Sequence, residues 1–437
     1  MTDRWYCTTT DTPWQARELP DTTDATPDLV VTGDRRQTVL GLGGCFNEAG
    51  WDALSDLPAD QRDGVLDDLF VDLGFDYCRV PIGASDYALQ WYSHDEHDGD
   101  LALEHFSVER DERYVLPYIR AARERRDDRG GLRLFASPWS PPTWMKSPKA
   151  YNHGRLRDEP EVLDAYARYL LKFVQAYRER GVEVGQVHVQ NEPYSDQKFP
   201  SCVMPPRQMA AFIREHLGPT FAAAGEDCEI WAGTFEKGIV HGWDLDPAHQ
   251  YPHLAHDLLR DPAVREHVAG VGVQWDGKGI VARLHHAFPD LPIVQTENEC
   301  GDGQNTWAYA FYVLDLIWHY FSNGCVAYVY WNMVLRAGGV STWGWKQNSM
   351  VCVDAGRAVR NPEFYVMKHL AHAARRGSTR LATSGVWSAF ALAFDDGDAT
   401  RVLLFNPYDT DEAVTIEAAG TTRTFALPAR SVHTLIL

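Results

Sequence analysis

The sequence predicts an α/β protein, a (β/α)8 TIM barrel with a side β-sandwich domain, and three observations support this. Eight short apolar runs alternate with helical patterns along most of the chain. The runs are continuously apolar, which is typical of parallel strands covered on both faces. They extend over about 340 residues, a size that a barrel with insertions reaches. After about residue 382, short strands separated by turns replace this pattern, which indicates a second, all-β unit.

The eight strand-like runs lie at 38–46, 77–83, 132–137, 184–190, 228–233, 268–274, 292–296 and 326–331. A doubly wound open sheet is the structural alternative. It would need fewer strands, and it usually carries a glycine-rich phosphate-binding turn. The stretch GLGG at 41–44 is not such a turn, because the GxGxxG pattern fails at Asn47 and Glu48.

Helices with readable ends lie between the runs. An apolar face follows Pro58 and stops at Gly74, and a longer one follows Pro160 and stops at Gly181. Thr306 is placed to cap an aromatic helix over 307–321. That stretch contains Asp315 and His319 and is shorter than the ~18 residues of a membrane helix, so we expect a buried helix and no membrane partner.

The C-terminal unit is predicted to be antiparallel, with strands at 386–394, 399–405, 413–417, 421–427 and 431–437. These strands are too few to bury both faces of a sandwich. The strand-like segments 5–10 and 29–31 have no other place, so we expect them to complete it. The predicted domains are a barrel over 38–380 and a side domain formed by 1–37 plus 381–437.

Charge and cysteine content restrict the class of protein. The 41 basic and 61 acidic residues give a net charge of −20, which argues against nucleic acid or an anionic membrane as a partner. The eight cysteines form no CxxC pair, and the N-terminus shows no signal-like apolar run. We therefore expect reduced thiols and a cytoplasmic location. The oligomeric state cannot be predicted.

Polar residues at the strand ends are the candidates for function, because barrel active sites lie at the C-terminal ends of the strands. These positions carry carboxylates, amides and tryptophans, with no Ser/His/Asp order and no HExxH motif. Tryptophan faces stack on sugar rings, while amides and acids bind hydroxyl groups. The candidates are Asn47, Glu48, Arg79, Asp86, Trp139, Asn191, Glu192, Gln274, Trp275, Asp276, Glu297, Glu299, Trp331 and Asn332.

Two carboxylates at a sugar acetal indicate glycoside hydrolysis, in which one acid donates a proton and the other attacks or activates water. Glu192 and Glu297 end the fourth and seventh strands, on roughly opposite sides of the ring. Glu299 is the alternative to Glu297, because residues two apart in a strand point the same way. Glu297 directly follows the apolar run, whereas Glu299 has entered the loop, so we favour Glu297.

Several blocks of this chain resemble glycoside hydrolase family 30, the clan A barrels that include the glucosylceramidases. They are GLGGCFNEAGWDAL at 41–54, CRVPIGASDYAL at 78–89, LFASPWSPPTWMK at 134–146, VHVQNEP at 187–193, IVQTENECGDG at 293–303 and YWNMVLRAGG at 330–339. The resemblance implies a barrel with a side β-sandwich and retention of configuration through a glycosyl-enzyme. It implies no metal and no cofactor.

Position by position, the resemblance makes Glu192 the acid/base and Glu297 the nucleophile. It implies that Asn191 binds the sugar 2-hydroxyl and that Arg79 pairs with Glu297. The implied contacts to the nonreducing-end sugar are Asp86, Trp139, Trp331 and, with a less certain alignment, Asn348. The tryptophans could instead be ordinary core aromatics.

Two departures from the glucosylceramidase pattern affect the substrate. Gln274-Trp275-Asp276 stands where glucosylceramidases have His-Trp-Tyr, so the tyrosine near the nucleophile is absent, and Asp276 is placed to contact substrate or to alter the nucleophile's pKa. The missing signal makes a ceramide substrate doubtful.

The sequence therefore predicts a carbohydrate substrate and a retaining, exo-acting β-glycosidase. The alternatives are an endo- or exo-acting β-1,6-galactanase or glucanase, a β-xylosidase, or a non-catalytic carbohydrate-binding protein.

Overall fold

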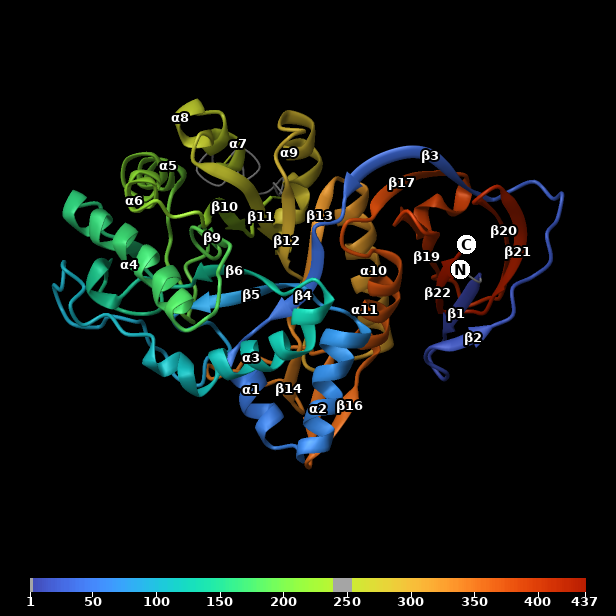
Figure 1. The fold of residues 1–437 in the computed structure, drawn as a ribbon, viewed down its shortest axis with the longest axis horizontal. Coiled ribbons are helices and arrows are strands. Elements are labelled where there is room, and N and C mark those ends of the chain that lie inside the picture. Colours follow the sequence, from blue (N-terminus) through green and yellow to red (C-terminus); the bar gives the residue numbers. More distant parts are fainter. Residues whose placement is uncertain (1–2, 239–253) are drawn as a thin grey trace, which may run out of the picture.

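The computed structural model describes residues 3–238 and 254–437. Its centre is a closed parallel barrel in the order β10-β11-β12-β13-β4-β5-β6-β9 (Figure 1). This confirms the predicted fold class. The strands are β4 Gly41–Cys45, β5 Tyr77–Ile82, β6 Arg133–Pro138, β9 Gln186–His188, β10 Glu229–Phe235, β11 Val268–Gln274, β12 Ile293–Glu297 and β13 Cys325–Asn332.

Helices surround the barrel where the chain returns between strands. They are α1 Glu48–Ser55, α2 Ala59–Asp67, α3 Val115–Arg126, α4 Pro160–Glu179, α5 Pro206–Ala211, α6 Gly218–Ala224, α7 Leu254–Leu259, α8 Pro262–Arg265, α9 Val281–Ala287, α10 Trp307–Ser322 and α11 Pro362–Ala373. The Thr306 hydroxyl caps α10 by accepting from the Tyr309 amide at 3.3 Å, as predicted. The helix predicted after Pro58 is α2 followed by one wide π-helical turn, Asp68–Asp72.

Large side chains fill the N-terminal half of the barrel. Tyr77, Phe135, Trp231 and Val294 pack together there and are almost completely buried. This layer separates the N-terminal end of the barrel from its C-terminal end, where barrel active sites lie.

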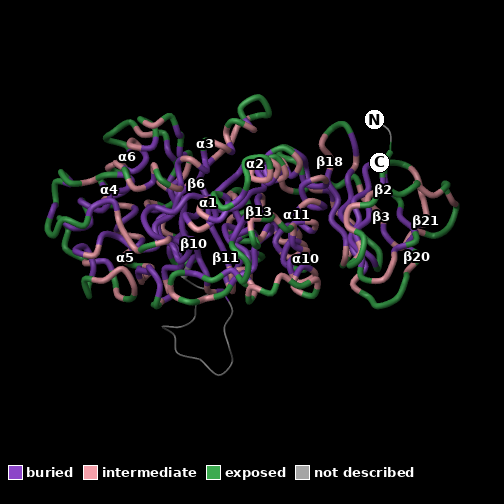
Figure 2. Tube along the Cα trace, turned by 90° about the horizontal axis from the view of Figure 1, so that it is seen from below, coloured by how far each residue is buried: buried purple, intermediate pink, exposed green. Residues whose placement is uncertain are grey.

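The side domain is a curved nine-stranded sheet, ordered β2-β1-β22-β19-β18-β17-β3-β20-β21. N-terminal strands complete it, as predicted, and its own apolar core includes Trp5, Val402 and Phe425 (Figure 2). Its strands are β1 Arg4–Thr8, β2 Gln15–Arg17, β3 Leu29–Thr38, β17 Thr379–Ser384, β18 Ala391–Asp395, β19 Thr400–Asn406, β20 Glu412–Ala418, β21 Thr421–Leu427 and β22 Ser431–Ile436.

Two details of the side domain differ from the prediction. The strand predicted over 386–394 begins as a 3-10 helix, Val386–Phe390, which follows Gly385 at a φ of +96°. The sheet is mixed, because β3 pairs in parallel with β20 while its other pairs are antiparallel. The spacing of turns in the sequence predicts the hairpins β18–β19 and β20–β21. It does not predict that the long strand β3 lies between them in the sheet.

Two smaller sheets lie outside the barrel and the side domain. β14 Val334–Arg336, β15 Val351–Asp354 and β16 Arg357–Arg360 form a small sheet after β13, and β7 Lys146–Ser147 pairs with β8 Arg155–Leu156. Within the described ranges, no helix combines the length and apolar character needed to cross a bilayer.

Candidate active site

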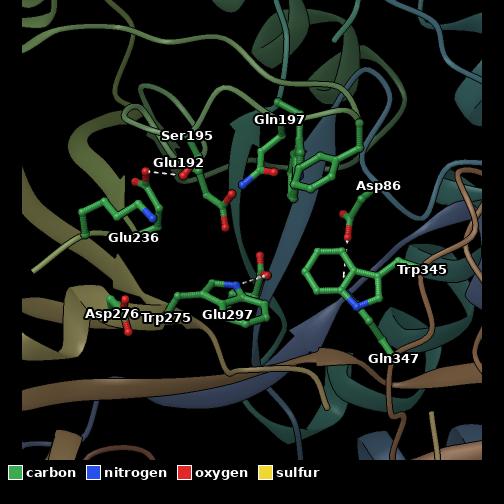
Figure 3. A pocket seen from close by; sticks show the side chains of 13 residues that line it. Asp86, Glu192, Ser195, Gln197, Glu236, Trp275, Asp276, Glu297, Trp345 and Gln347 are labelled. Atoms are coloured by element: carbon green, nitrogen blue, oxygen red, sulfur yellow. Dashed lines mark hydrogen bonds between the residues drawn. The ribbon is translucent and has the colours of Figure 1, made fainter. Parts of the chain in front are cut away.

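A cavity of about 140 Å³ opens at the C-terminal ends of the barrel strands (Figure 3). Carboxylates, amides and aromatic rings line it together. The lining residues are Asp86, Trp139, Glu192, Ser195, Gln197, Phe199, Glu236, Lys237, Trp275, Asp276, Glu297, Trp345 and Gln347.

Glu297 is the last residue of β12, and three strong donors converge on its carboxylate. Arg79 donates to Oε2 at 2.9 Å, Gln274 donates to Oε2 at 3.2 Å, and the indole of Trp275 donates to Oε1 at 2.9 Å. Gln274 and Trp275 lie at the end of the neighbouring strand β11, and Arg79 reaches Glu297 from within β5. This set of donors favours the carboxylate form of Glu297.

Glu192 lies in the turn that follows β9, at the rim opposite Glu297. Its φ is +47°, in the left-handed region that few non-glycine residues adopt. The turn is held by backbone bonds from Asn191 to Pro138 at 2.8 Å and from Glu192 to Thr234 at 3.1 Å. The neighbouring strand ends therefore fix the position of the Glu192 side chain.

One amide group links the two glutamates. Nε2 of Gln274 lies 3.2 Å from Oε1 of Glu192 and 3.2 Å from Oε2 of Glu297. These two carboxylate oxygens are therefore no more than about 6.4 Å apart, twice the bond length, and they face each other across the cavity.

Burial and charge separate the acidities of the pair. Burial and the negative charges of Glu297, Glu236 and Asp86 raise the pKa of Glu192 well above its usual range. Burial also raises the pKa of Glu297, but Arg79, Trp275 and Gln274 oppose that shift. A proton shared by the pair therefore lies on Glu192.

Arg79 is completely buried and connects several predicted site residues. Besides Glu297, it donates to Asn191 Oδ1 at 2.7 Å and to Ser137 at 2.9 Å. Its guanidinium lies 4.4 Å from the ring centre of Trp139 and 5.5 Å from that of Trp331. Both indoles therefore lie close to the positive charge that faces Glu297.

A chain of amides leads to Asp86 on the far side of the cavity. Asn47 donates to Asn332 at 2.9 Å, Asn332 donates to Gln347 at 2.7 Å, and Gln347 donates to Asp86 Oδ2 at 3.5 Å. Oδ1 of Asp86 is buried and has no partner within the described ranges. That oxygen is available to accept from a bound molecule.

Comparison with known families decides which kind of site this is. The chain matches the glycosyl hydrolase family 30 TIM-barrel domain over residues 39–374. The chain belongs to glycosyl hydrolase family 30. It is a glycoside hydrolase, and its substrate is a carbohydrate.

Relatives within family 30 have different activities in their names. The putative glucosylceramidase 3 of Caenorhabditis elegans is 26% identical, with 93% of this chain and 81% of that protein aligned. The endo-1,6-beta-D-glucanase of Neurospora crassa is also 26% identical, over 94% and 86%. The solved structure of the endo-beta1,6-glucanase BT3312 has the same fold, with a TM-score of 0.84, 23% identity and coverage of 99% and 98%.

The structure places most of the predicted site residues of this family 30 chain around one cavity. Asp86, Trp139, Glu192, Asp276 and Glu297 line it. Arg79, Asn191 and Gln274 lie directly behind these and bond to them or to one another. Trp331 is fully buried, stacks on Trp139 at 5.2 Å between ring centres, and does not line the cavity.

Three residues predicted as site residues or alternatives have other partners. Asn348 donates to Glu363 at 2.6 Å and accepts from the Gly303 amide, so it holds the loop after β12, and its neighbour Gln347 reaches the cavity instead. Asp276 pairs with Lys278 at 3.3 Å and makes no bond to Glu297. Glu299 bonds to Lys278 at 2.6 Å and to Tyr312 at 2.7 Å, so both its oxygens are occupied.

Sequence reasoning missed several features of the site, and two residues show why. Trp275 was counted among the strand-end residues but not as a donor to Glu297, because its side chain turns inward only at a φ of +48°. Glu236 was missed because the predicted fifth strand ended at residue 233, whereas β10 continues to Phe235. Glu236 directly follows β10, and the rule on strand ends, applied to the longer strand, identifies it.

No group of three or more His, Cys, Asp or Glu side chains suited to hold a metal ion occurs among residues 3–238 and 254–437.

Proposed function

We propose that this chain is a retaining, exo-acting β-glycosidase in which Glu192 is the acid/base and Glu297 the nucleophile. The short separation of the two carboxylates is the observation that carries this proposal. Retaining glycosidases hold their carboxyl groups about 5–5.5 Å apart, and inverting enzymes about 6.5–9.5 Å, to leave room for water. One amide group bridges the pair, and the limit of about 6.4 Å that it sets between these two oxygens agrees with the closer, retaining arrangement.

The two carboxyl groups have suitable protonation states for the first step. Glu192 gives its proton to the oxygen of the departing group, while Glu297 attacks the anomeric carbon and forms a glycosyl ester. The three donors around Glu297 keep it ionised for this attack.

The second step reverses these roles. Once Glu297 is an ester, its negative charge is gone, and the pKa of Glu192 falls because that charge helps to raise it. Glu192 then takes a proton from water, whose oxygen attacks the anomeric carbon and releases Glu297. The sugar leaves with its original configuration.

Exo action is supported by the shape of the site. The cavity is small, and Asp86 with its amide chain forms one side of it. A terminal sugar with free hydroxyl groups offers donors to the unpartnered Oδ1 of Asp86. Asn191 uses its oxygen to accept from Arg79 and Gln274, which leaves its NH2 for the 2-hydroxyl group.

A substrate screen followed by stereochemical analysis tests this proposal. Aryl β-D-glycosides of glucose, galactose, xylose and fucose identify the sugar. ¹H NMR of the first product should then show the β anomer, and an α anomer would rule out retention. Digestion of a β-linked oligosaccharide of the same sugar should release only monosaccharide, whereas larger early products would indicate an endo-acting enzyme instead.

A further inference from the structure

A fourth buried carboxyl group lies on the side of the cavity opposite Asp86. Glu236 follows β10, is 3% exposed and lines the same cavity. Figure 3 shows Glu236 and Asp86 on opposite sides, with Glu192 and Glu297 between them. The proposed reaction uses Glu192, Glu297 and Asp86 and leaves Glu236 without a role.

The two oxygens of Glu236 have different surroundings. Oε1 accepts from the Ser195 hydroxyl at 2.7 Å and from the Tyr194 amide at 3.1 Å, which fixes the carboxyl group. Oε2 is buried and has no hydrogen-bond partner in the described part of the chain. A buried oxygen without a partner costs free energy, and a bound donor removes that cost.

The position of the acid identifies which part of the substrate reaches Glu236. Glu192 must face the oxygen of the leaving group in order to protonate it. If Asp86 binds the sugar that is transferred, the leaving group extends to the other side. Ser195 and Asp276 lie on that side with Glu236. An alkyl chain there would bury these polar groups without replacing their hydrogen bonds to water.

We propose that Glu236 is a specificity-determining residue that accepts a hydrogen bond from a hydroxyl group of the leaving group, which is therefore itself a sugar and not a lipid. This inference rests on the proposed function, because it needs Glu192 to mark the leaving-group side. Burial raises the pKa of Glu236 to about 7, so Oε2 becomes a charged acceptor as the pH rises through neutrality.

The test compares two substrates that share one sugar. The aryl β-glycoside from the screen has no hydroxyl groups on its leaving group, whereas the β-linked disaccharide of that sugar has several. In Glu236→Gln, the amide oxygen still accepts from Ser195 and Tyr194, but an NH2 group replaces Oε2. The ratio of kcat/KM for the disaccharide to that for the aryl glycoside should fall about 10-fold or more.

Asp86→Asn is the matched control, because it alters the side that binds the transferred sugar. It should lower kcat/KM for both substrates in similar proportion and leave the ratio within about 2-fold. A loss of acidity at Glu192 would also lower this ratio, because a sugar leaving group needs the proton and an activated aryl group does not. The methyl β-glycoside of the same sugar separates the two causes, because its alkoxide leaving group needs the proton as well but carries no hydroxyl group. If Glu236→Gln leaves the ratio of kcat/KM for the disaccharide to that for the methyl glycoside unchanged, Glu236 acts only through Glu192 and the inference is wrong.

A comparison within the wild-type protein needs no variant. The disaccharide should be hydrolysed with a higher kcat/KM than the β-glycosylceramide of the same sugar in mixed micelles. Preference for the glycosylceramide, or hydrolysis of the aryl glycoside without the disaccharide, would overturn the inference and leave the proposed function standing. Failure of the wild-type protein on every β-glycoside would instead refute the proposed function.

Discussion

The indole nitrogen of Trp275 donates a 2.9 Å hydrogen bond to Oε1 of Glu297. Arg79 and Gln274 bond to the other oxygen. The Cys300 thiol lies 3.9 Å from Oε1 and is a weaker donor than the indole. Glucosylceramidases have a tyrosine at the position of Asp276, and this chain lacks it. The structure shows that Trp275, one residue earlier, supplies a hydrogen-bond donor to Glu297. This bond stabilises the ionised form of the proposed nucleophile.

Trp275→Phe removes that donor and keeps an aromatic ring. A hydrogen bond to a charged group contributes about 1.5–3 kcal/mol, so kcat/KM should fall roughly 10- to 100-fold. Because the anion of Glu297 loses a donor, its pKa rises, and the acidic limb of the kcat/KM profile should move to higher pH. A profile measured on the aryl glycoside shows this, and an unmoved acidic limb would contradict the assigned role.

Trp144→Phe is the control for this variant. Trp144 is also buried, and its indole donates at 3.1 Å to the backbone oxygen of Asp95, with no bond to Glu297. Its loss should affect stability without shifting the acidic limb.

Arg79→Met should destabilise the fold strongly. Arg79 and Glu297 form a buried ion pair, and removal of one partner leaves the other charge uncompensated. We expect the free energy of unfolding in urea to fall by about 3–5 kcal/mol at neutral pH. As a control, Arg430→Met breaks an exposed pair with Asp409 and should cause no large change. If both variants lower the free energy of unfolding by the same amount, the ion pair between Arg79 and Glu297 is not buried as the structure shows.

Glu297→Gln should lower the pKa of Glu192. Burial is the largest cause of the raised pKa of Glu192, and the charge of Glu297 is the next. Titration of ¹³C-labelled carboxyl groups by NMR measures the change, with Glu192→Gln to assign the signal. Glu299→Gln should shift it less, because Glu299 is bonded to Lys278 and Tyr312. A pKa that stays or rises in Glu297→Gln would show that the two groups are not coupled.

Glu192→Gln should be rescued by azide in a characteristic way. Without the acid/base, an aryl glycoside with a good leaving group still forms the glycosyl ester, but water attacks it slowly. Azide needs no base, so it should restore turnover and give the β-glycosyl azide. In Glu297→Ala, azide should instead give the α-glycosyl azide, because it replaces the nucleophile directly. An α-glycosyl azide from Glu192→Gln and a β-glycosyl azide from Glu297→Ala would show that Glu192 is the nucleophile and Glu297 the acid/base.

The fold could be predicted because its signals are local. Eight apolar runs, Thr306 as a cap and Pro160 at the start of α4 each depend on a few neighbouring residues. The parallel pairing of β3 with β20 joins residues nearly 390 positions apart, and no local pattern marks it. The mostly apolar residues of the 3-10 helix before β18 fit a buried strand equally well, so the sequence predicts a strand there.

The sequence predicts which site residues lie at strand ends, but not how side chains in the following loops are oriented. Strand ends and the family resemblance together identified Glu192, Glu297, Arg79 and Asp86. The direction of a side chain beyond a strand end depends on backbone angles such as the +48° φ of Trp275. A one-residue difference in a loop decides whether Asn348 or Gln347 reaches Asp86, and an alignment across a loop does not resolve that.

Covalent trapping of the nucleophile tests the central claim most directly. The protein is incubated with a 2-deoxy-2-fluoro β-glycoside that carries a good leaving group, digested, and its peptides are mapped by mass spectrometry. The account predicts one glycosyl group attached to Glu297. A label on Glu299, or hydrolysis without any trapped ester and with an α product, would contradict it.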